Sequence, residues 1–268
     1  MKTLIVIPAR YGSTRLPGKP LALIAGKTLL HRVVSITQEV AKNHPSIEVV
    51  VATDDERIME HAHSLGVAGV MTSPDCATGT DRVLEAAKKQ KNKPDFVLNL
   101  QGDAPFTPPD FLTAMIAYAE SHPHVEMVTP VYRLTWQDLD RLRENKKKTP
   151  FSGTTAIVDE RGKALWFSKS ILPQIRGEEK LRTSQPISPV LGHIGLYGYS
   201  LPFLEKFVSW PQGHYETLEG LEQLRVLENG SSIQAVVVDY KGRPRLSGID
   251  SPEDVVRAEN LIKEYSLS

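Results

Sequence analysis

The residues best able to do chemistry near the amino terminus are the cations and glycines of one loop. This loop follows a short apolar run and contains Arg10, Gly12, Arg15, Gly18 and Lys19. Glycines let the backbone turn sharply and approach a ligand closely, and Arg and Lys bind several negative charges at once. At the carboxyl end of a first strand, such a loop indicates a phosphate site. The P-loop and dinucleotide-binding patterns are both absent, and an ordinary basic loop stays the alternative.

Carboxylates that follow apolar runs are the candidate metal ligands. Asp103 comes directly after Gly102 and the run at residues 96–100. Magnesium prefers one or two carboxylates together with phosphate oxygens and water, so Asp103 lies where a nucleotide-bound ion would be held. A turn aspartate is the alternative. Asp54 and Asp55 also follow an apolar run, but we expect them to cap the next helix.

Composition limits the class of protein. The 268 residues contain 32 Lys and Arg and 32 Asp and Glu, so the net charge is zero. This balance argues against a nucleic-acid partner but leaves room for a small basic pocket. The one cysteine, Cys76, excludes an internal disulfide and a Cys-based zinc cluster. Because no signal region and no run of 18 apolar residues occurs, we expect a soluble, cytoplasmic protein without a membrane partner.

Apolar periodicity predicts the elements that position these residues, and strands alternate with helices. The expected strands are residues 4–7, 47–52, 67–71, 96–100, 125–134, 192–199 and 233–238, with a hairpin at 155–159 and 164–167. The expected helices are residues 29–40, 56–65, 80–89, 109–120, 201–208, 215–228 and 252–265. Thr80 or Asp81 is expected to cap the third helix. Residues 139–148 are interpreted as a solvated helix end or surface loop, and residues 178–190 as a mobile loop.

The segment IPARYGSTRLPGKPL resembles the opening of the CMP-sugar synthetases, above all the 3-deoxy-manno-octulosonate (Kdo) cytidylyltransferases. In that family the loop holds the triphosphate of CTP. The resemblance implies that Arg10 and Lys19 contact phosphates, with Ala9, Ser13 and Arg15 nearby.

A second motif, GTDR, is similar to the one that lines the cytosine pocket of the family. The resemblance places Gly79, Thr80 and Arg82 in the nucleotide site. A loop that ends in a helix cap is the alternative.

Two acidic motifs resemble those that bind magnesium in the family. QGDAP is similar to QGDEP, and GIDSPED to GVDTPEDL. The resemblance implies that Asp103 and Asp250 ligate Mg²⁺, the expected cofactor, and that Gln101 reaches both nucleotide and sugar. Lys19, Asp103 and Asp250 are then the catalytic set.

Two further motifs resemble those that form the sugar pocket of the family. HIGLYGY resembles HIGIYAY, and LEGLEQLRVLE resembles LExLEQLRxLE. The resemblance assigns His193, Tyr199, Glu222 and Gln223 to the sugar pocket. A structural histidine, packed tyrosines and a solvated helix face are the alternatives.

The six motifs occur in the family order and span nearly the whole chain. They imply an α/β fold with a mostly parallel, doubly wound sheet of the nucleotide-diphospho-sugar transferase type. Residues 1–268 would form one nucleotidyltransferase domain, with about 121–200 as a smaller dimerisation and sugar-binding subdomain of a homodimer. The implied reaction joins CTP and Kdo, a 3-deoxy-2-keto sugar acid, to give the CMP-sugar and pyrophosphate for lipopolysaccharide synthesis. A glycosyltransferase or a non-catalytic nucleotide-binding regulator would be an alternative of another class.

Departures from the family motifs bear on the choice of sugar. Ser73 stands where the family has Arg, Cys76 where it has His, and Lys169 where its YFSR motif has Arg. A pocket with fewer cations discriminates less against a substrate that carries its own positive charge. The 8-amino-8-deoxy analogue of Kdo is therefore the alternative substrate. Cys76 is interpreted as a small wall residue and not as a nucleophile, and the role of Arg176 stays open.

Overall fold

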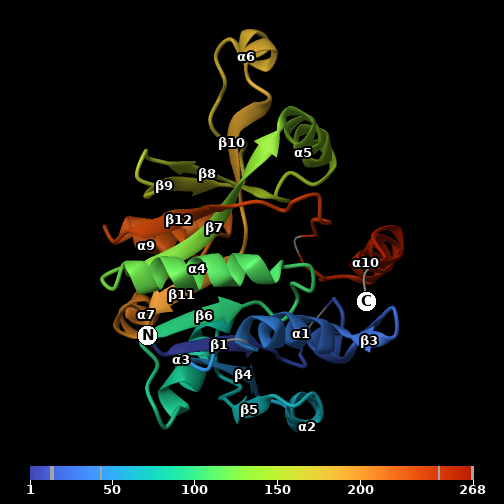
Figure 1. Cartoon of the computed structure of the whole chain (residues 1–268), viewed down its shortest axis with the longest axis vertical. Coiled ribbons are helices and arrows are strands. Elements are labelled where there is room, and N and C mark those ends of the chain that lie inside the picture. The colour runs from blue at the N-terminus through green and yellow to red at the C-terminus, as the bar shows by residue number, and fades with distance from the viewer. Residues whose placement is uncertain (13–14, 43, 247, 267–268) are drawn as a thin grey trace.

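Strands and helices alternate through the first half of the chain, as the apolar pattern predicts (Figure 1). The computed structural model describes residues 1–12, 15–42, 44–246 and 248–266. Its strands are β1 (Thr3–Pro8), β2 (Leu23–Ile24), β3 (Lys27–Thr28), β4 (Ile47–Thr53), β5 (Ala68–Met71), β6 (Phe96–Leu100), β7 (Met127–Thr135), β8 (Thr154–Val158), β9 (Ala164–Ser168), β10 (Ile187–His193), β11 (Leu196–Ser200) and β12 (Ile233–Val238). Its helices are a 3₁₀ turn (Lys19–Leu21), α1 (Leu29–Ala41), α2 (Glu56–Ser64), α3 (Gly79–Lys89), α4 (Pro109–Ser121), α5 (Trp136–Lys148), α6 (Glu178–Ser184), α7 (Leu201–Ser209), α8 (His214–Glu219), α9 (Leu224–Glu228) and α10 (Pro252–Glu264).

The first strand, β1, is buried on both faces. Ile5 and Ile7 belong to the hydrophobic core on one face of the sheet, and Leu4 and Val6 belong to the core on the other. Because successive side chains of a strand point to opposite faces, a strand covered on both sides needs a continuous apolar run. This requirement explains why the predicted strand contains no polar residue between its ends.

The main sheet has the strand order β5-β4-β1-β6-β11-β7-β10-β8-β9, and β12 pairs with β7. The pairings β5–β4, β4–β1, β1–β6 and β12–β7 are parallel. The α/β class with a mostly parallel sheet is confirmed for this part, whereas β11, β10, β8 and β9 extend the sheet antiparallel. The parallel register brings the carboxyl ends of β1, β4 and β6 to one edge, which is where ligands bind in open α/β sheets.

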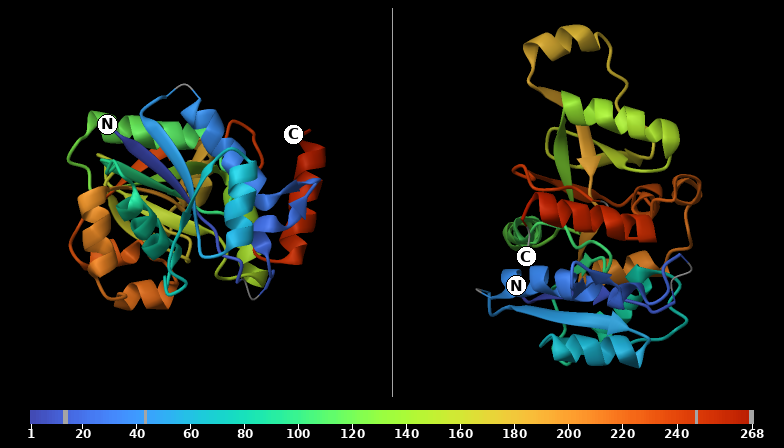
Figure 2. Two further views of the ribbon diagram at one scale, coloured as in Figure 1. Left: turned by 90° about the horizontal axis from the view of Figure 1, so that it is seen from below. Right: turned by 90° about the vertical axis from the view of Figure 1, so that its right-hand side faces the viewer.

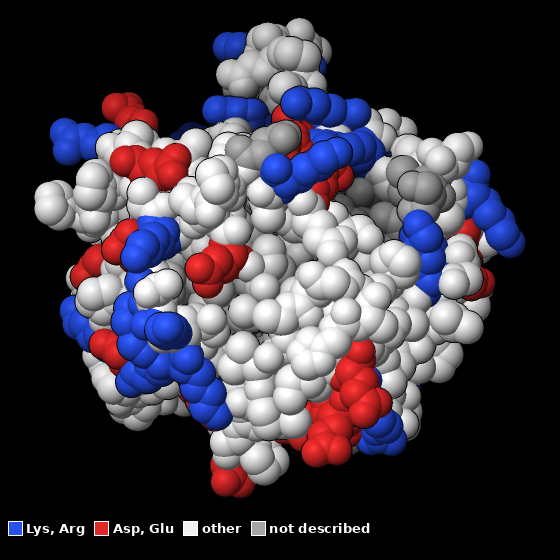
Figure 3. Space-filling view, turned by 60° about the horizontal axis from the view of Figure 1, so that its bottom comes forward, with Lys and Arg blue, Asp and Glu red and all other residues white. Residues whose placement is uncertain are grey.

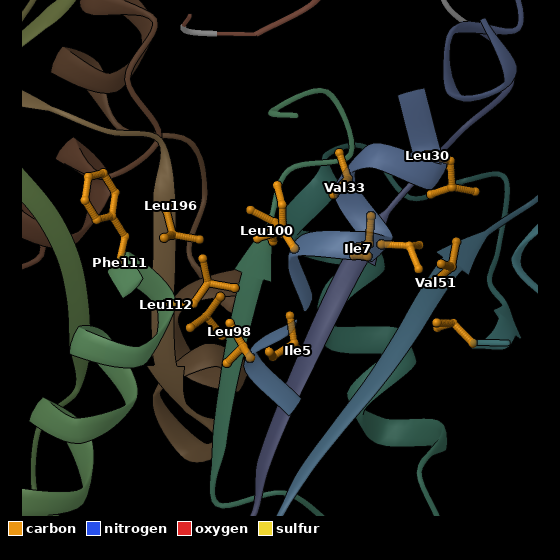
Figure 4. Close-up of a cluster of buried hydrophobic side chains, with 14 of the residues drawn as sticks. Ile5, Ile7, Leu30, Val33, Val51, Leu98, Leu100, Phe111, Leu112 and Leu196 are labelled. Carbon is orange, nitrogen blue, oxygen red and sulfur yellow. The ribbon is translucent and has the colours of Figure 1, made fainter. Parts of the chain in front are cut away.

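Helices cover both faces of the parallel strands (Figures 1 and 2). From α1, Leu30 and Val33 pack toward Ile7, and from α4 Leu112 packs toward Leu98, with Phe111 in the same hydrophobic core (Figure 4). Helices α3 and α7 supply the opposite core. With helices on both sides, the faces of the parallel strands are covered, and their ends remain as a place for a ligand.

The long strand β7 links this layered body to a projecting part of the chain (Figure 1). Its first residues pair with β11, and its later ones pair with β10. A small third core of Leu134, Leu139 and Val190 holds α5 against β7 and β10. The assignment of about 121–200 to a dimerisation subdomain stays a prediction.

The expected mobile loop at 178–190 is wrong. Residues Glu178–Ser184 form α6, and β10 begins at Ile187. Arg143 donates two hydrogen bonds of 2.7 Å to the carboxylate of Glu178, and Trp136 Nε1 donates to the carbonyl of Gln185. The segment is polar because its order depends on ion pairs and not on an apolar face.

The expected single helix at 215–228 is also wrong. Gly220 has a φ of +62°, the left-handed conformation that ends a helix, and it separates α8 from α9. The leucines therefore do not share one face, and Leu218 is 63% exposed. A buried pair between Arg225 and Glu216, with N–O distances of 2.6 and 2.8 Å, joins the two short helices.

The expected strand at 192–199 is two strands. Strand β10 ends at His193 and β11 begins at Leu196. Between them the Ile194 N–H donates to the carbonyl of Pro130, and the chain continues in the same direction, because β10 and β11 both pair antiparallel with β7. The alternation of apolar residues continues across this interruption and therefore conceals it.

The face displayed in Figure 3 carries basic side chains interspersed with acidic ones. Such mixing agrees with the neutral composition of the chain. Among the described residues, no helix has the length and apolar character needed to cross a membrane.

The close approach of β11 to β6 predicts the effect of a small substitution. A Cβ at Gly198 would overlap the ring of Phe96, which is 1% exposed, whereas a Cβ at Gly195 would meet nothing within 4 Å. Gly198→Ala should lower the free energy of unfolding by about 1–3 kcal/mol, as overpacking does. Urea denaturation measures this, with Gly195→Ala as the matched control. Equal stability of the two variants would contradict the packing described.

Candidate active site

The candidate active site is a cavity of about 400 Å³ at the carboxyl ends of β1 and β6. Its described walls come from the loop after β1, the start of α3, the turn after β6 and the residue that precedes the cap of α10. The lining residues are Pro8, Ala9, Arg10, Gly12, Arg15, Lys19, Pro20, Cys76, Ala77, Thr78, Gly79, Arg82, Gln101, Gly102, Asp103 and Asp250. Nine residues predicted for the nucleotide and metal sites line this cavity, although they come from distant parts of the chain. Thr80, which was also predicted, does not line it.

Two glycines let the backbone form this cavity. A Cβ at Gly102 would lie 2.5 Å from the carbonyl oxygen of Pro8, so the turn after β6 can touch the end of β1 only without a side chain. At Gly79 a Cβ would be 3.5 Å from the side-chain oxygen of Gln101, an ordinary contact. Gly102 is therefore the position where the geometry of the site demands glycine.

The centre of the site is an ammonium held between two carboxylates. Lys19 Nζ lies 2.7 Å from Asp103 Oδ2 and 3.1 Å from Asp250 Oδ1. The lysine side chain is 17% exposed, and the two aspartates are 29% and 46% exposed. Burial lowers the pKa of Lys19, but the charges of both aspartates outweigh burial and raise its pKa overall. Lys19 is thus protonated, and both carboxylates are still accessible from the cavity.

Asp250 reaches this position through backbone contacts. The Ile249 N–H donates a 2.9 Å hydrogen bond to the carbonyl of Asp103, which ties the two acidic segments together. Ser251 then caps α10, and Asp254 completes the capping box by accepting from the Ser251 N–H. The cap fixes the turn that directs Asp250 toward Lys19.

The other cations of the loop are more open. Arg10 and Arg15 are exposed, and Arg15 lies 3.4 Å from Asp250 Oδ1. Ala9 is buried at the loop's start, where its N–H donates to the carbonyl of Ala52. Ser13, the remaining predicted residue of this loop, lies outside the described residues. The loop can therefore offer positive charge to an anion that enters the cavity.

The GTDR segment begins α3, and its cap differs from the prediction. Thr78 is the N-cap, and its hydroxyl accepts from the Asp81 N–H in a capping box. Arg82 is 3% exposed and donates to Asp54 Oδ2 at 2.9 Å and to Thr72 Oγ1. Asp55, not Asp54, caps α2. Arg82 therefore forms part of the cavity wall, and the carboxylate of Asp54 balances its charge.

Thr80 connects the cavity to a second polar cluster. Its hydroxyl donates a 2.6 Å hydrogen bond to Glu222 Oε2. Burial raises the pKa of Glu222, and the bond from Thr80 and the charge of Arg225 oppose that rise. The contact joins α3, on the nucleotide side, to the segment that carries the predicted sugar ligands.

The second cluster is a chain of neutral hydrogen bonds. Thr129 Oγ1 donates its one proton to the carbonyl of Leu196 at 2.9 Å. In its 2.9 Å contact with His193 Nε2 the hydroxyl must therefore accept, so that Nε2 carries the proton. His193 Nδ1 then accepts from Gln223 Nε2 at 3.5 Å, and Gln223 Oε1 accepts from Tyr197 OH at 3.0 Å. We assign this tautomer from the network, which has no charged member.

The same cluster determines the ionisation of its members. Burial, and secondarily the charge of Lys169, lowers the pKa of His193 to about 3. Burial also raises the pKa of Tyr197. Neutral groups with fixed donors and acceptors are suited to binding hydroxyl groups of a ligand.

Two tyrosines of β11, of which only Tyr199 was predicted for the site, differ in placement. Tyr199 is fully buried in the core beside Phe207, with its hydroxyl unpartnered among the described residues. Tyr197, which the family motif did not single out, has its hydroxyl on Gln223 instead. The alternation along β11 places the two tyrosines on the same face, and only the depth of each decides which meets the cluster.

Lys169 lies beside the neutral cluster. Its ammonium is 3.3 Å from Thr154 Oγ1, and burial lowers its pKa while the charge of Glu219 opposes the change. Glu219 accepts 2.7 Å hydrogen bonds from Ser168 Oγ and from the Lys169 N–H. Glu219 was missed from sequence because it lies off the leucine stripe of the predicted continuous helix, on the face that would normally be solvated.

Cys76 is part of the wall. Its Sγ lies 3.3 Å from Glu85 Oε2, and burial followed by this hydrogen bond raises the thiol pKa to about 11. A thiol with so high a pKa is a poor nucleophile at neutral pH. Arg176 is exposed on the chain before α6 and does not line the cavity.

A divalent ion would have two protein ligands here. No three His, Cys, Asp or Glu side chains converge on one point in the part of the chain that the structure describes. Asp103 and Asp250 nevertheless present oxygens to one common cation, the Lys19 ammonium. Two hard oxygen donors in an open cavity fit an ion such as magnesium, which takes its other ligands from phosphate and water.

A comparison with known protein families shows to which family the chain belongs. Residues 4–233 match the family model described as cytidylyltransferase. The 3-deoxy-manno-octulosonate cytidylyltransferase of Maricaulis maris (strain MCS10) is 43% identical over 263 residues, 98% of this chain and 97% of that protein. This chain is a member of the cytidylyltransferase family.

Within that family the chain is similar to proteins of one specificity. The 3-deoxy-manno-octulosonate cytidylyltransferase of Chlamydia abortus (strain DSM 27085 / S26/3) is 37% identical, over 99% of this chain and 95% of the relative. A solved CMP:2-keto-3-deoxy-manno-octonic acid synthetase in complex with CTP matches with a TM-score of 0.82 at 32% identity. The match covers 99% of this chain and 100% of that one. The resemblance of the motifs to the Kdo cytidylyltransferases is therefore confirmed.

The half-buried histidine, His193, predicts how stability depends on pH in this cytidylyltransferase. The pKa of His193 is lowered from 6.5 to about 3 in the folded state, so the unfolded chain binds the proton first as pH falls. Wild type should lose up to about 2 kcal/mol relative to His193→Gln between pH 7.5 and pH 5. Urea unfolding at both pH values measures this difference, since other groups titrate alike in the two proteins. Parallel stability curves would show that His193 is not held neutral.

Proposed function

We propose that this protein transfers CMP from CTP to the anomeric hydroxyl of 3-deoxy-manno-octulosonate and releases pyrophosphate. The observation that carries the proposal is the Lys19 ammonium between Asp103 and Asp250 in a cavity at the strand ends of a cytidylyltransferase fold. The relatives named above, and the CTP complex among them, support these two substrates. The reaction is a displacement at the α-phosphorus, which needs positioning and charge neutralisation more than covalent catalysis.

The cationic loop would bind the triphosphate. Arg10 and Arg15 reach the cavity from its open side, and Lys19 lies at its centre. When phosphates enter, the Lys19 ammonium can exchange a carboxylate partner for a phosphate oxygen without a change of charge state. Charge that develops on the leaving pyrophosphate is thereby offset by fixed donors.

Asp103 and Asp250 would hold magnesium. The two carboxylates fit that ion by donor type and accessibility. When bound, the ion supplies charge neutralisation at phosphate oxygens and lowers the pKa of a coordinated hydroxyl. The chain itself contributes the placement of the two carboxylates, through the Ile249–Asp103 backbone bond and the cap at Ser251.

The neutral cluster would bind the sugar acid. His193, Gln223 and Tyr197 offer fixed donors and acceptors for hydroxyl groups. Lys169, the half-buried cation beside them, would pair with the carboxylate of the substrate. The Thr80–Glu222 bond would keep this pocket in register with the nucleotide.

Pyrophosphate release is the decisive assay. Purified protein with CTP, Kdo and magnesium should release one pyrophosphate for each CMP-sugar formed, and none when either substrate is omitted. Asp103→Asn, which keeps the volume and loses the charge, should abolish most of the release. Binding of CTP without turnover would overturn the proposal in favour of a nucleotide-binding regulator.

The same assay tests the alternative sugar. With Kdo and its 8-amino-8-deoxy analogue in competition, the positive charge of Lys169 should disfavour the amino sugar. The structure thus gives no observation that favours the analogue over Kdo. A kcat/KM ratio in favour of the analogue would reassign the substrate and keep the reaction.

The projecting part of the chain supports a proposal about assembly. Phe151, Leu165 and Ile187 are 70%, 54% and 43% exposed on or beside β8, β9 and β10. We propose that about 121–200 contacts a second copy and thus forms the dimerisation subdomain of a homodimer. We also propose a cytoplasmic location and a role in lipopolysaccharide synthesis, because CTP is a cytoplasmic nucleotide and an activated Kdo serves that pathway in the family.

We expect the transition state to be less stabilised when the positive charge of Lys19 is removed. Lys19→Met keeps most of the volume but removes the charge, and kcat/KM for CTP should fall roughly 30- to 1,000-fold, or about 2–4 kcal/mol. Steady-state kinetics measure the loss. Lys91→Met, at an exposed position before β6, is the matched control and should behave as wild type. A Lys19→Met enzyme of normal kcat/KM would remove this residue from the catalytic set.

A further inference from the structure

Tyr11 lies within the phosphate loop but does not line its cavity. Its neighbours Arg10 and Gly12 are wall residues. The Tyr11 ring instead packs on the main hydrophobic core and under a guanidinium, with Arg57 Cζ 3.5 Å from the ring centroid. The residue thus lies between the loop and the body of the protein.

Two described parts of the loop, at Tyr11 and at Gly18, meet at this ring. Gly18 donates its N–H to the carbonyl of Tyr11 at 3.1 Å, which ties the two ends of the loop together. A Cβ at Gly18, where φ is +68°, would lie 3.2 Å from the ring atoms of Tyr11, so the ring rests directly on this glycine. Lys19 follows at once, and the position of its backbone therefore depends on the contact between Tyr11 and Gly18.

Arg57 is itself held in place. Its Nε donates to Asp55 Oδ1 at 3.0 Å and its terminal nitrogen lies 2.6 Å from Asp55 Oδ2. Asp55 is also the N-cap of α2. Because α2 follows β4, and β4 pairs with β1, the guanidinium stands at a position set by the sheet. The Tyr11 ring is then enclosed between a fixed cation and a glycine.

We propose that Arg57 and Tyr11 are positioning residues that hold the phosphate loop ready for the triphosphate. Neither lines the cavity, and both act through the backbone that carries Arg10, Arg15 and Lys19. An aromatic ring under a guanidinium is an attractive contact that an aliphatic side chain cannot replace. A loop ordered before binding loses less conformational entropy when the ligand arrives. The inference rests on the proposed function only in naming CTP as the ligand.

Calorimetric binding of CTP to the full chain, without sugar acid, tests the inference. Tyr11→Leu and Arg57→Met should each raise the Kd for CTP about tenfold, the factor that corresponds to ~1.4 kcal/mol, and the double variant should be no weaker than either single one. Tyr11→Phe keeps the ring and should bind as wild type. The Kd for cytidine, which lacks phosphates, should be unchanged in every variant.

Kinetics and thermal unfolding separate positioning from a structural role. In active protein the variants should raise KM for CTP and leave KM for the sugar acid, kcat and Tm close to wild type. An unchanged Kd for CTP in Tyr11→Leu would overturn the inference, as would equal losses for CTP and cytidine. A fall in Tm with a parallel rise of both KM values would show a structural role only. If the sugar acid is not turned over but CTP binding changes as described, the proposed reaction fails and the inference stands. If wild type does not bind CTP, both fail.

Discussion

One ammonium between two carboxylates organises the active end of this molecule. Lys19, Asp103 and Asp250 come from the first loop, the middle and the last part of the chain, and they meet within 3.1 Å of one nitrogen atom. Two carboxylates placed so close repel each other unless a cation lies between them. The ion pairs are therefore what allows the three segments to converge in the free protein. The same carboxylates stay accessible, so the arrangement can be exchanged when a ligand brings its own charges.

The backbone has to meet strict conditions for this convergence. Gly102 touches the carbonyl of Pro8, and Ile249 donates to the carbonyl of Asp103. Both contacts join strand ends or loops at one edge of the parallel part of the sheet, where β1 and β6 lie side by side. A parallel sheet provides this edge because all its strands end in the same direction. The helices cover the two faces of these strands, and the cavity lies at the strand ends.

Two adjoining regions of the site differ in how they treat charge. The side proposed to bind the nucleotide is open and has the Lys19 ammonium at its centre, in keeping with a ligand that carries several charges. The side proposed to bind the sugar is more buried, and its hydrogen bonds run through neutral His193, Gln223 and Tyr197. Burial disfavours a charged histidine and favours fixed hydrogen bonds, so this region is better suited to binding hydroxyl groups than charged groups. Thr80, in α3, and Glu222, in the segment between α8 and α9, connect the two regions.

The sequence alone determined the parallel strands, most of the helices and the cationic loop that lines the cavity. A strand buried on both faces must be apolar throughout, as at Leu4–Ile7, and a glycine-rich loop with several cations after it predicts an anion site. The family motifs added Asp250, for which position in the chain offered no argument. Only the tertiary structure decided the rest, because those features depend on contacts between distant residues. The order of α6 depends on Arg143 meeting Glu178, and the break between α8 and α9 depends on Arg225 meeting Glu216 across Gly220. The choice of Tyr197 over Tyr199 depends on depth within the core, and the tie from Tyr11 to Arg57 depends on β1 and β4 being neighbours. Local periodicity carries none of these contacts, since each is made across the fold and not along the chain.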